Sequence, residues 1–325
     1  MELNRRDRIL KNIVELFIKT AQPVSSQALI ECYSLDYSSA TIRAEMNLLE
    51  KSGLIEKTHT SSGRVPSSLG YKYYVDNLRS KGVDEEIRFR LQAVLDQKMQ
   101  TVEQVMNKAG EILANMTDLV SVILGPKASS EHLVSLQLIP ISKNSVTAIF
   151  VTDRGCVENK TFLLSDDISV DDLKDSMTII GDRLKGSRID ELIAKLINLK
   201  PVLTDYIVEH EIIYQALIEA VSKFQEERLS YFNEEKIYQL PYLKNNSKKI
   251  EQTLFELDKE DEELLIKIGG ENEDITIVRA KIQGDGEDDG VIALIGPKRM
   301  DYEKAVNSLE FILNELKAKK KEGGR

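Results

Sequence analysis

A basic, hydroxyl-rich segment near the amino terminus carries the side chains best suited to binding chemistry. Residues 57–75 contain no acidic side chain but include Lys57, Arg64 and Lys72, together with the short sequences TSSG and GRVP. A solvated loop has no need of such a composition. Cations and hydroxyls without neighbouring acids are groups that bind phosphates. The segment therefore predicts a negatively charged partner.

The charge of the chain is unevenly distributed. The 325 residues have a formal net charge of −10, yet residues 1–80 hold 11 Lys and Arg against 9 Asp and Glu, and the remainder holds 33 against 45. An acidic surface repels DNA phosphates, so the amino-terminal part is the surface predicted to meet an anion.

Composition favours a soluble globular protein, with 42% hydrophobic and 30% charged residues. No apolar run approaches the ~18 residues that span a bilayer, and the charged start MELNRRDRIL lacks the apolar core of a secretion signal. The two cysteines, Cys32 and Cys156, lie far apart without metal-ligand spacing and fit a reducing compartment. We expect a cytoplasmic protein without membrane contact, metal or cofactor.

The first 80 residues predict short helices followed by a hairpin. Helical spacing of apolar residues marks RRDRILKNIVELFIKT, SQALIECY and ATIRAEMNLLEKSG. Two short strands then bracket the TSSG tip, and SLGYKYYVDNL is a further helix. Helix, helix–turn–helix and hairpin is the order of a winged helix DNA-binding domain. Tyr71, Tyr73 and Tyr74 are predicted to be core or boundary residues rather than base-stacking ones.

The third of these helices is the predicted reading helix. Its apolar residues gather on one face, and the opposite strip is slim enough to approach base-pair edges. Arg43 could form a bidentate pair with guanine, and Asn47 could pair with adenine. Ser38 and Ser39 come at the start of the helix, where hydroxyls and free backbone N–H groups suit a phosphate.

The small hairpin tip is predicted to approach the DNA backbone or minor groove. Arg64 and Lys72 are expected to make charge contacts, and the side chains of the tip to donate hydrogen bonds. Replacing Arg64 with Ala should then weaken all DNA binding and lower the salt slope by about 1. The complete predicted DNA-binding set is Ser38, Ser39, Thr41, Arg43, Asn47, His59, Thr60, Ser61, Ser62, Arg64 and Lys72.

The rest of the chain predicts an α+β body. Residues 84–118 indicate one long amphipathic helix, packed on its own domain or used between subunits. Strands are predicted in HLVSLQLIPI, SVTAIFVT and CVENKTFLL, followed by a mainly helical region at 170–233. Strands in DEELLIKIGG, ITIVRAKI and GVIALIGP precede a terminal helix at 301–319.

Three smaller motifs carry no catalytic or phosphate-binding signal. GDGEDDG at 284–290 has GxG spacing but is acidic and lies between strands, so we predict a hairpin tip rather than a phosphate loop. Asp301 is predicted to cap the last helix, whereas Arg299 is either a surface residue or an anchor of a domain interface. The three histidines are scattered and no nucleophile motif is present, so an enzyme is the least favoured function.

The run SSATIRAEMNLLEKSGLIEKTHTSSGRVPSSLGYKYYVD closely resembles the HrcA family, the heat-inducible transcription repressors of bacterial chaperone operons. GVIALIGPKRMDY is similar to the carboxy-terminal signature of that family, and the order of segments agrees along the chain. The chain has Ala44 where the family usually has Asn, Ser25 where it has Gly, and Lys72 where Arg is common. Ala44 removes a polar contact, and Lys72 weakens bidentate pairing at its position.

The resemblance implies an α+β multidomain chain and a homodimer. The implied domains are a winged helix at 1–80, a GAF-like domain at 81–125 and 235–325, and an inserted dimerisation domain at 126–234. It further implies binding to an inverted-repeat operator in double-stranded DNA, repression of groE and dnaK operons, and activity that depends on the GroEL chaperonin. A regulator that senses a small molecule through the GAF-like domain is the alternative.

Overall fold

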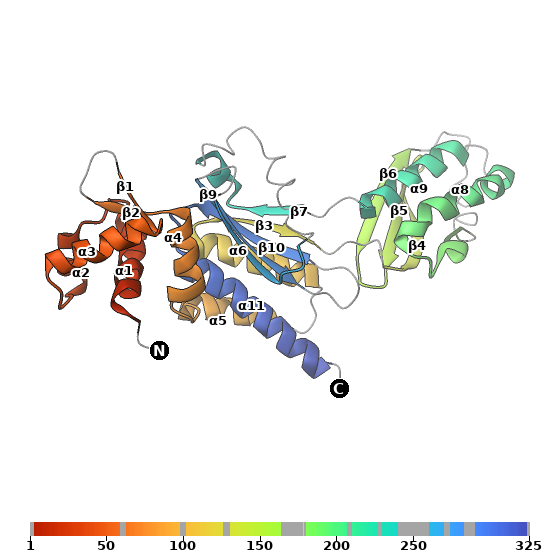
Figure 1. Ribbon diagram of the computed structural model, residues 1–325. Helices are drawn as coiled ribbons and strands as arrows, with labels where there is room; N and C mark the ends of the chain where they lie inside the picture. The colour runs from red at the N-terminus through yellow and green to blue at the C-terminus, as the bar shows by residue number, and fades with distance from the viewer. Residues whose placement is uncertain are drawn as a thin grey trace.

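The protein is a mixed α+β chain whose elements form three groups in a row (Figure 1). The computed structural model describes residues 3–58, 63–97, 102–125, 131–163, 178, 180–206, 210–225, 229–239, 260–269, 274–282 and 290–323. Among these residues, no helix is both long and apolar enough to cross a membrane.

The first group, here called the amino-terminal unit, has the predicted order of helices and hairpin. Its elements are α1 (Arg5–Thr20), α2 (Ser26–Tyr33), α3 (Ser39–Lys51), β1 (Ile55–Lys57), β2 (Arg64–Pro66), α4 (Ser68–Tyr73) and the π-helical turn η1 (Tyr74–Leu78). Strands β1 and β2 pair antiparallel. Each α-helix starts at a residue whose side chain accepts a hydrogen bond from the first turn, which explains these boundaries: Asn4, Ser25, Ser38 and Ser67.

The second group, the central body, is an antiparallel sheet with helices packed against it. Its elements are α5 (Glu85–Leu95), α6 (Val102–Thr117), β3 (Val120–Leu124), β7 (Leu229–Phe232), the 3₁₀ helix η2 (Glu234–Gln239), β8 (Leu264–Ile268), β9 (Ile275–Ile282), β10 (Gly290–Pro297) and α11 (Tyr302–Gly323). The strand order is β7-β3-β10-β9-β8. Helices α5, α6 and α11 pack together and on the sheet (Figure 1).

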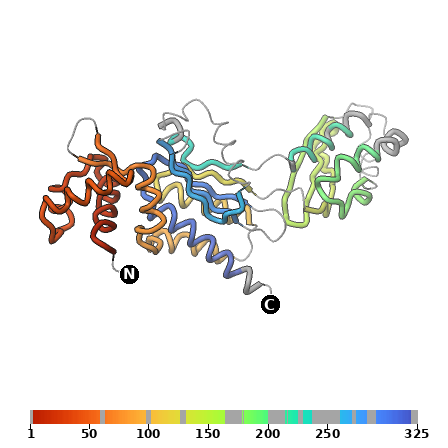
Figure 2. The backbone as a smooth tube through the Cα atoms, viewed as in Figure 1, coloured from red at the N-terminus to blue at the C-terminus, as the bar shows by residue number. Residues whose placement is uncertain are grey.

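The third group, the inserted unit, lies in the chain between β3 and β7. It contains β4 (Leu133–Ser142), β5 (Ser145–Thr152), β6 (Val157–Leu163), α8 (Ile189–Tyr206) and α9 (His210–Gln225). The strands form an antiparallel sheet of order β4-β5-β6. The backbone trace leaves the central body after β3 and returns to it at β7 (Figure 2).

Buried apolar residues form separate clusters, one of which extends across two of these groups. One cluster runs without interruption from α1 to α11 and includes Ile9, Tyr71 and Tyr302. The inserted unit has its own cluster around Phe150 and Phe224. A further cluster covers the other face of the central sheet. The amino-terminal unit therefore shares a core with the central body, whereas the inserted unit does not.

One prediction about the body is wrong, and another holds over a shorter range. The expected single helix over 84–118 is two helices, because α5 ends at Leu95 and packs against α6, and both contact α11. The helical region expected at 170–233 ends earlier, because Leu229–Phe232 is strand β7 and pairs with β3.

The six strand segments predicted between residues 132 and 297 all appear, as β4, β5, β6, β8, β9 and β10. Strands β9 and β10 pair antiparallel on either side of the acidic motif, from Ile275↔Pro297 to Ile282↔Gly290. The motif itself, apart from Gly290, lies outside the described residues.

Candidate nucleic-acid interface

Helix α3 presents the polar strip that the sequence predicts. Its buried side chains include Ile42, Met46 and Leu49, which pack into the shared core. On the opposite side the exposed residues are Ala40, Arg43, Ala44, Asn47, Leu48 and Lys51. Because the alanines are small, this face of the helix can come close to another surface.

Glu45 lies on the buried side of α3, as expected, and fixes the helix to α1. Its carboxylate accepts hydrogen bonds from Arg5 Nε at 2.9 Å and Arg6 Nε at 3.0 Å. Burial of the carboxyl would raise its pKa, but the hydrogen bonds from Arg6 and Arg5 outweigh burial and hold the pKa below its usual value. The negative charge is thus neutralised inside the unit and is absent from the exposed strip.

The hydroxyls of Ser38 and Ser39 are both used inside the fold: Ser38 caps α3, and Ser39 connects α3 to α2. Ser38 Oγ accepts the N–H of Thr41 at 3.1 Å and lies 2.9 Å from Thr41 Oγ1. Ser39 Oγ lies 3.0 Å from Ser26 Oγ, which joins α3 to α2. The Ser39 hydroxyl therefore helps to fix the angle between the two helices of the helix–turn–helix, whereas the Ser38 hydroxyl fixes the start of α3.

Arg43 points along the exposed face of α3 toward the start of α2. Its Nε donates to Ser26 Oγ at 3.2 Å. Within the described part of the chain its terminal nitrogens make no hydrogen bond to the protein, so the fork of the guanidinium is available to a ligand. A guanidinium held through Nε with both terminal nitrogens outward is suited to bidentate binding of a carbonyl, a phosphate or a guanine edge.

A hollow of about 590 Å³ lies beside this strip, between α2, α3 and the hairpin. Three cationic side chains contribute to its wall, and the remaining lining residues are mostly polar. The residues that line it are Ser25, Ser26, Gln27, Arg43, Met46, Asn47, Lys57 and Arg64. A positively charged, polar hollow beside an exposed helix is suited to an anionic ligand such as a phosphate.

Lys57 and Gln27 are members of this wall that the predicted set omits. Lys57 is in the basic segment that first suggested an anionic partner, but its place on β1 beside α3 depends on the hairpin register. Gln27 is in the first turn of α2, and only the packing of α2 on α3 brings it to the hollow. No local sequence signal marks it.

The structure places Arg64 differently from the prediction. Its side chain is only 9% exposed, and Nε donates to Glu50 Oε2 at 2.8 Å. Its backbone N–H and C=O both bond to Val24, at 2.9 and 2.8 Å. The guanidinium is thus paired inside the fold, and its expected charge contact with DNA stays a prediction.

The remaining predicted residues of the hairpin region have mixed outcomes. Lys72 is exposed on α4, which is compatible with a phosphate contact. His59, Thr60, Ser61 and Ser62 lie outside the described residues. Their expected donor role stays a prediction.

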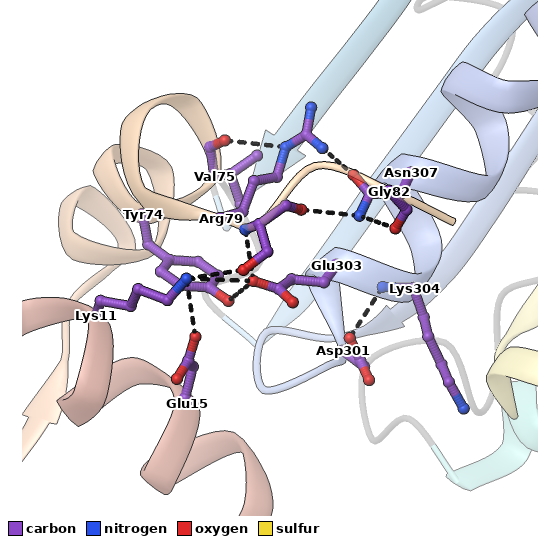
Figure 3. A network of polar contacts seen from close by, with 11 residues as sticks. Lys11, Glu15, Tyr74, Val75, Arg79, Gly82, Asp301, Glu303, Lys304 and Asn307 are labelled. Carbon is purple, nitrogen blue, oxygen red and sulfur yellow. Dashed lines mark hydrogen bonds and ion pairs between the residues drawn. The ribbon is translucent and has the colours of Figure 1, made fainter. Parts of the chain in front are cut away.

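The tyrosines join the amino-terminal unit to the central body, and the prediction that they are core or boundary residues is confirmed. The Tyr71 ring lies 5.3 Å from the ring of Tyr302, centroid to centroid. Tyr74 is buried, and its hydroxyl donates to Glu303 at 3.0 Å (Figure 3). Burial, followed by the nearby charge of Glu303, raises the pKa of Tyr74 far above its usual range. Tyr73, half-buried, donates instead to Asp7 inside the unit.

Glu303 is the centre of a polar network at this joint (Figure 3). In addition to the hydrogen bond from the Tyr74 hydroxyl, the Glu303 carboxylate accepts one from the backbone N–H of Ser80 at 2.7 Å. Lys11 Nζ lies 3.9 Å from the same carboxylate. Lys11 also pairs with Glu15 at 3.4 Å. Burial raises the pKa of Glu15, although Lys11 opposes this. Several elements thus meet at one carboxylate near the start of α11.

Arg79 and Arg299 complete the joint. The Arg79 guanidinium donates to Asn307 and Glu310 of α11, while its Nε bonds to Val75 O at 3.1 Å. Arg299 Nη1 donates to Ile18 O at 2.6 Å, so the interface role considered for it is confirmed. The expected cap is also present, because Asp301 Oδ1 accepts the N–H of Lys304 at 2.9 Å.

An exposed polar helix beside a basic hollow, held on an α+β body, is typical of regulators that act on nucleic acid. Comparison with known proteins gives the class directly. A family model described as the HrcA protein C terminal domain matches residues 103–306. A heat-inducible transcription repressor HrcA of Bacillus pumilus is 35% identical over 335 aligned residues, covering 97% of this chain and 97% of that protein.

The chain belongs to the HrcA family of heat-inducible transcription repressors, whose members are not enzymes. The repressor HrcA of Halalkalibacterium halodurans is 32% identical, again over 97% of both chains. A solved structure described as a hypothetical protein at 2.2 Å resolution is 23% identical and superposes with a TM-score of 0.73 over 98% of both chains. That structure supports the fold alone.

Proposed function

We propose that this repressor binds an inverted-repeat operator in double-stranded DNA as a homodimer, with the amino-terminal unit acting as a winged helix domain. The observation that carries the proposal is the exposed strip of α3, with Arg43 and Asn47 beside the basic hollow. Arg43 would read guanine in the major groove, and Lys72 would contact a phosphate. Repression follows because the bound protein occupies the operator. This would take place in the cytoplasm, where the chromosome lies.

A single α3 can contact only a few base pairs, so one unit alone would have little specificity. Two units related by a twofold axis would read two half-sites, which an inverted repeat supplies. A dimer is therefore expected whichever residues make the individual base contacts. It also requires a surface that joins two chains.

The open face of the inserted sheet is the surface that we propose for this contact. Side chains that point toward α8 and α9 belong to the buried cluster, whereas the opposite face includes Ile139 at 41% and Val157 at 53% exposure. The paired residues on that face carry no charge in three successive rows: Ser135/Val151/Val157, Gln137/Ile149/Asn159 and Ile139/Thr147/Thr161. An uncharged, partly apolar sheet face suits burial against a second copy.

A charge on this face tests the dimer. Ile139→Asp should convert the dimer to a monomer in analytical ultracentrifugation, because a desolvated carboxylate opposes the contact. Ile197→Asp is the matched control, since Ile197 is similarly exposed but lies on α8. A dimer that survives Ile139→Asp and fails with Ile197→Asp would place the contact elsewhere.

Heat control is proposed to act through the stability of the body. Because a single apolar cluster joins α1 to α11, partial unfolding of the central body also releases the amino-terminal unit. Dependence on the GroEL chaperonin would follow, since refolding restores operator binding. After heating and cooling, recovery of binding should be faster with GroEL, its co-chaperonin and ATP than without them. Recovery of operator binding at the same rate without GroEL would argue against the proposed dependence on the chaperonin.

Footprinting of the purified protein on the region upstream of its own gene, at several salt concentrations, tests operator binding. Protection of a palindromic site is expected, with weaker binding as salt rises. Arg43→Ala should reduce the preference for that site over a scrambled duplex by about tenfold or more. Lys19→Ala, an exposed cation at the end of α1, is the control and should leave the preference unchanged.

A second hollow favours the alternative of a ligand-responsive regulator. It also measures about 590 Å³ and lies between the segment after η1, β8 and α11. Lys81, Glu263 and Asn314 are among its polar lining residues. A small molecule bound there would contact the connection between the amino-terminal unit and the central body. A rise in melting temperature with a compound from a metabolite panel would favour this alternative.

A further inference from the structure

The carboxylate of Glu50 connects the reading helix to both strands of the hairpin. Glu50 is on α3, and its Oε2 accepts from Arg64 Nε on β2 at 2.8 Å. Its Oε1 lies 3.4 Å from Lys57 Nζ on β1. One side chain therefore connects three elements at the base of the hairpin.

The backbone around Arg64 adds a further connection. The paired N–H and C=O bonds between Arg64 and Val24 join β2 to the turn before α2. At Gly63, an added Cβ would lie 2.7 Å from Pro23 Cβ and 2.9 Å from the Pro23 carbonyl atoms, so the chain packs closely on that turn. The base of the hairpin is thus fixed against both helices of the helix–turn–helix.

Arg64 also reaches the predicted base-reading amide. Its Nη2 donates to Asn47 Oδ1 at 3.5 Å, a long hydrogen bond that orients the amide. With the oxygen directed toward Arg64, the Asn47 amide presents its nitrogen to solvent. That group donates, so it suits an acceptor in the major groove, such as guanine O6 or N7, adenine N7 or thymine O4.

We propose that Glu50 and Arg64 are positioning residues for DNA reading: they hold the hairpin at a fixed angle to α3 and orient Asn47 as a donor. This proposal rests on the proposed DNA binding. Arg64 then acts through Asn47 and the hairpin and makes no phosphate contact of its own. This role explains why Glu50, whose side chain is 27% exposed, lies beside a DNA-binding surface even though its carboxylate repels phosphate.

A direct phosphate contact by Arg64 predicts opposite effects. If Arg64 bound phosphate, Glu50→Gln would release the guanidinium and remove a negative charge, so any duplex would be bound more tightly. If Glu50 positions Arg64, the same change weakens operator binding and leaves scrambled DNA bound as before or slightly more tightly. The two explanations therefore differ in the sign of the effect on operator affinity.

The experiment measures fluorescence anisotropy of the full-length dimer on labelled operator and scrambled duplexes over a range of salt. Glu50→Gln and Arg64→Ala should each lower the preference for the operator by about tenfold. The slope of log K against log salt should stay as in wild type, whereas loss of one phosphate contact would lower it by about 0.9. The double variant should lose no more than either single variant, because both changes remove one connection.

Arg64→Lys keeps the proposal testable if Arg64→Ala fails to fold. Lysine retains the charge, but its single ammonium cannot bond Glu50 and Asn47 in the same fork geometry. We expect the operator preference to fall with the salt slope unchanged. Near-normal preference in Arg64→Lys, tighter binding by Glu50→Gln, or a reduced slope in Arg64→Ala would each overturn the proposal. Wild-type protein without any operator preference would instead overturn the proposed function itself.

Discussion

The amino-terminal unit and the inserted unit are attached to the central body in opposite ways. The amino-terminal unit shares an apolar cluster with α11 and is also joined to it by the polar network around Glu303. The inserted unit packs around its own cluster, separate from that of the body. A unit that shares a core with its neighbour is expected to unfold with it, whereas a unit with its own core can unfold alone.

This difference assigns separate tasks to the two attachments. The shared core links the position of α3 to the folded state of the central body, as the proposed heat control through stability requires. The separate core lets the inserted unit present its open sheet face without affecting α3. Variants of the two cores and of the joint test this division.

Truncation of a core ring in each unit should give the largest and most contrasting effects. Tyr71→Ala removes a ring of the shared cluster, and Phe150→Ala removes one of the separate cluster; both side chains are at most 1% exposed. Each should cost about 3–5 kcal/mol. Hydrogen exchange should rise in both α1 and α11 for Tyr71→Ala, and only in the inserted unit for Phe150→Ala.

A Tyr71→Ala variant in which α1 exchanges faster while α11 keeps its protection would show that the amino-terminal unit unfolds independently. The shared core would then have no role in coupling.

Loss of one hydroxyl across the joint should have a smaller effect. Tyr74→Phe removes the donor to Glu303 and should lower the free energy of unfolding by about 1.5–3 kcal/mol, since the acceptor is charged and partly buried. It should also lower the temperature at which operator binding is lost. Differential scanning fluorimetry and binding at increasing temperature measure both.

Tyr73→Phe is the matched control for Tyr74→Phe. It makes the same chemical change, but its hydroxyl donates to Asp7 inside the amino-terminal unit, where water can replace it. If Tyr73→Phe lowers the free energy of unfolding as much as Tyr74→Phe does, the hydrogen bond across the joint contributes no more than one inside the unit.

Tyr71→Phe should have the opposite sign. The Tyr71 hydroxyl is buried without a hydrogen-bond partner among the described residues, so its removal relieves an unsatisfied polar group. We expect a change between zero and about 1 kcal/mol of stabilisation. Chemical denaturation of wild type and variant measures the difference, and a clear destabilisation would reveal a partner for this hydroxyl.

The smallest effect should depend on pH. The folded pKa of Glu45 is depressed, so its contribution to stability is present above its ordinary value of 4.5 and disappears as pH falls through the folded pKa. Glu45→Gln should therefore be less stable than wild type near pH 7, and this difference should vanish in acid. Arg5 and Arg6 are about half exposed, so the effect is small. An acid-insensitive difference in melting temperature would contradict it.

Local sequence signals predicted the amino-terminal unit well, since caps such as Ser25 and Ser38 and the spacing of Ile42, Met46 and Leu49 act within one helix. Prediction failed where distant pairing decides the structure. The apolar residues of β3 directly continue the helical pattern of α6, and β7 comes shortly after helix α9. Neither segment was therefore predicted to be a strand. Both exist because they pair with each other and because β3 also pairs with β10.

The helix–turn–helix, the hairpin and the exposed strip with Arg43 and Asn47 follow from local sequence signals, because caps, periodicity and turn residues act over a few positions. Only the tertiary structure decided that Arg64 is buried against Glu50 rather than free, and that Tyr71 and Tyr74 join the unit to α11. A side chain's charge is encoded locally, but its partner is chosen by packing between segments that are far apart in the chain.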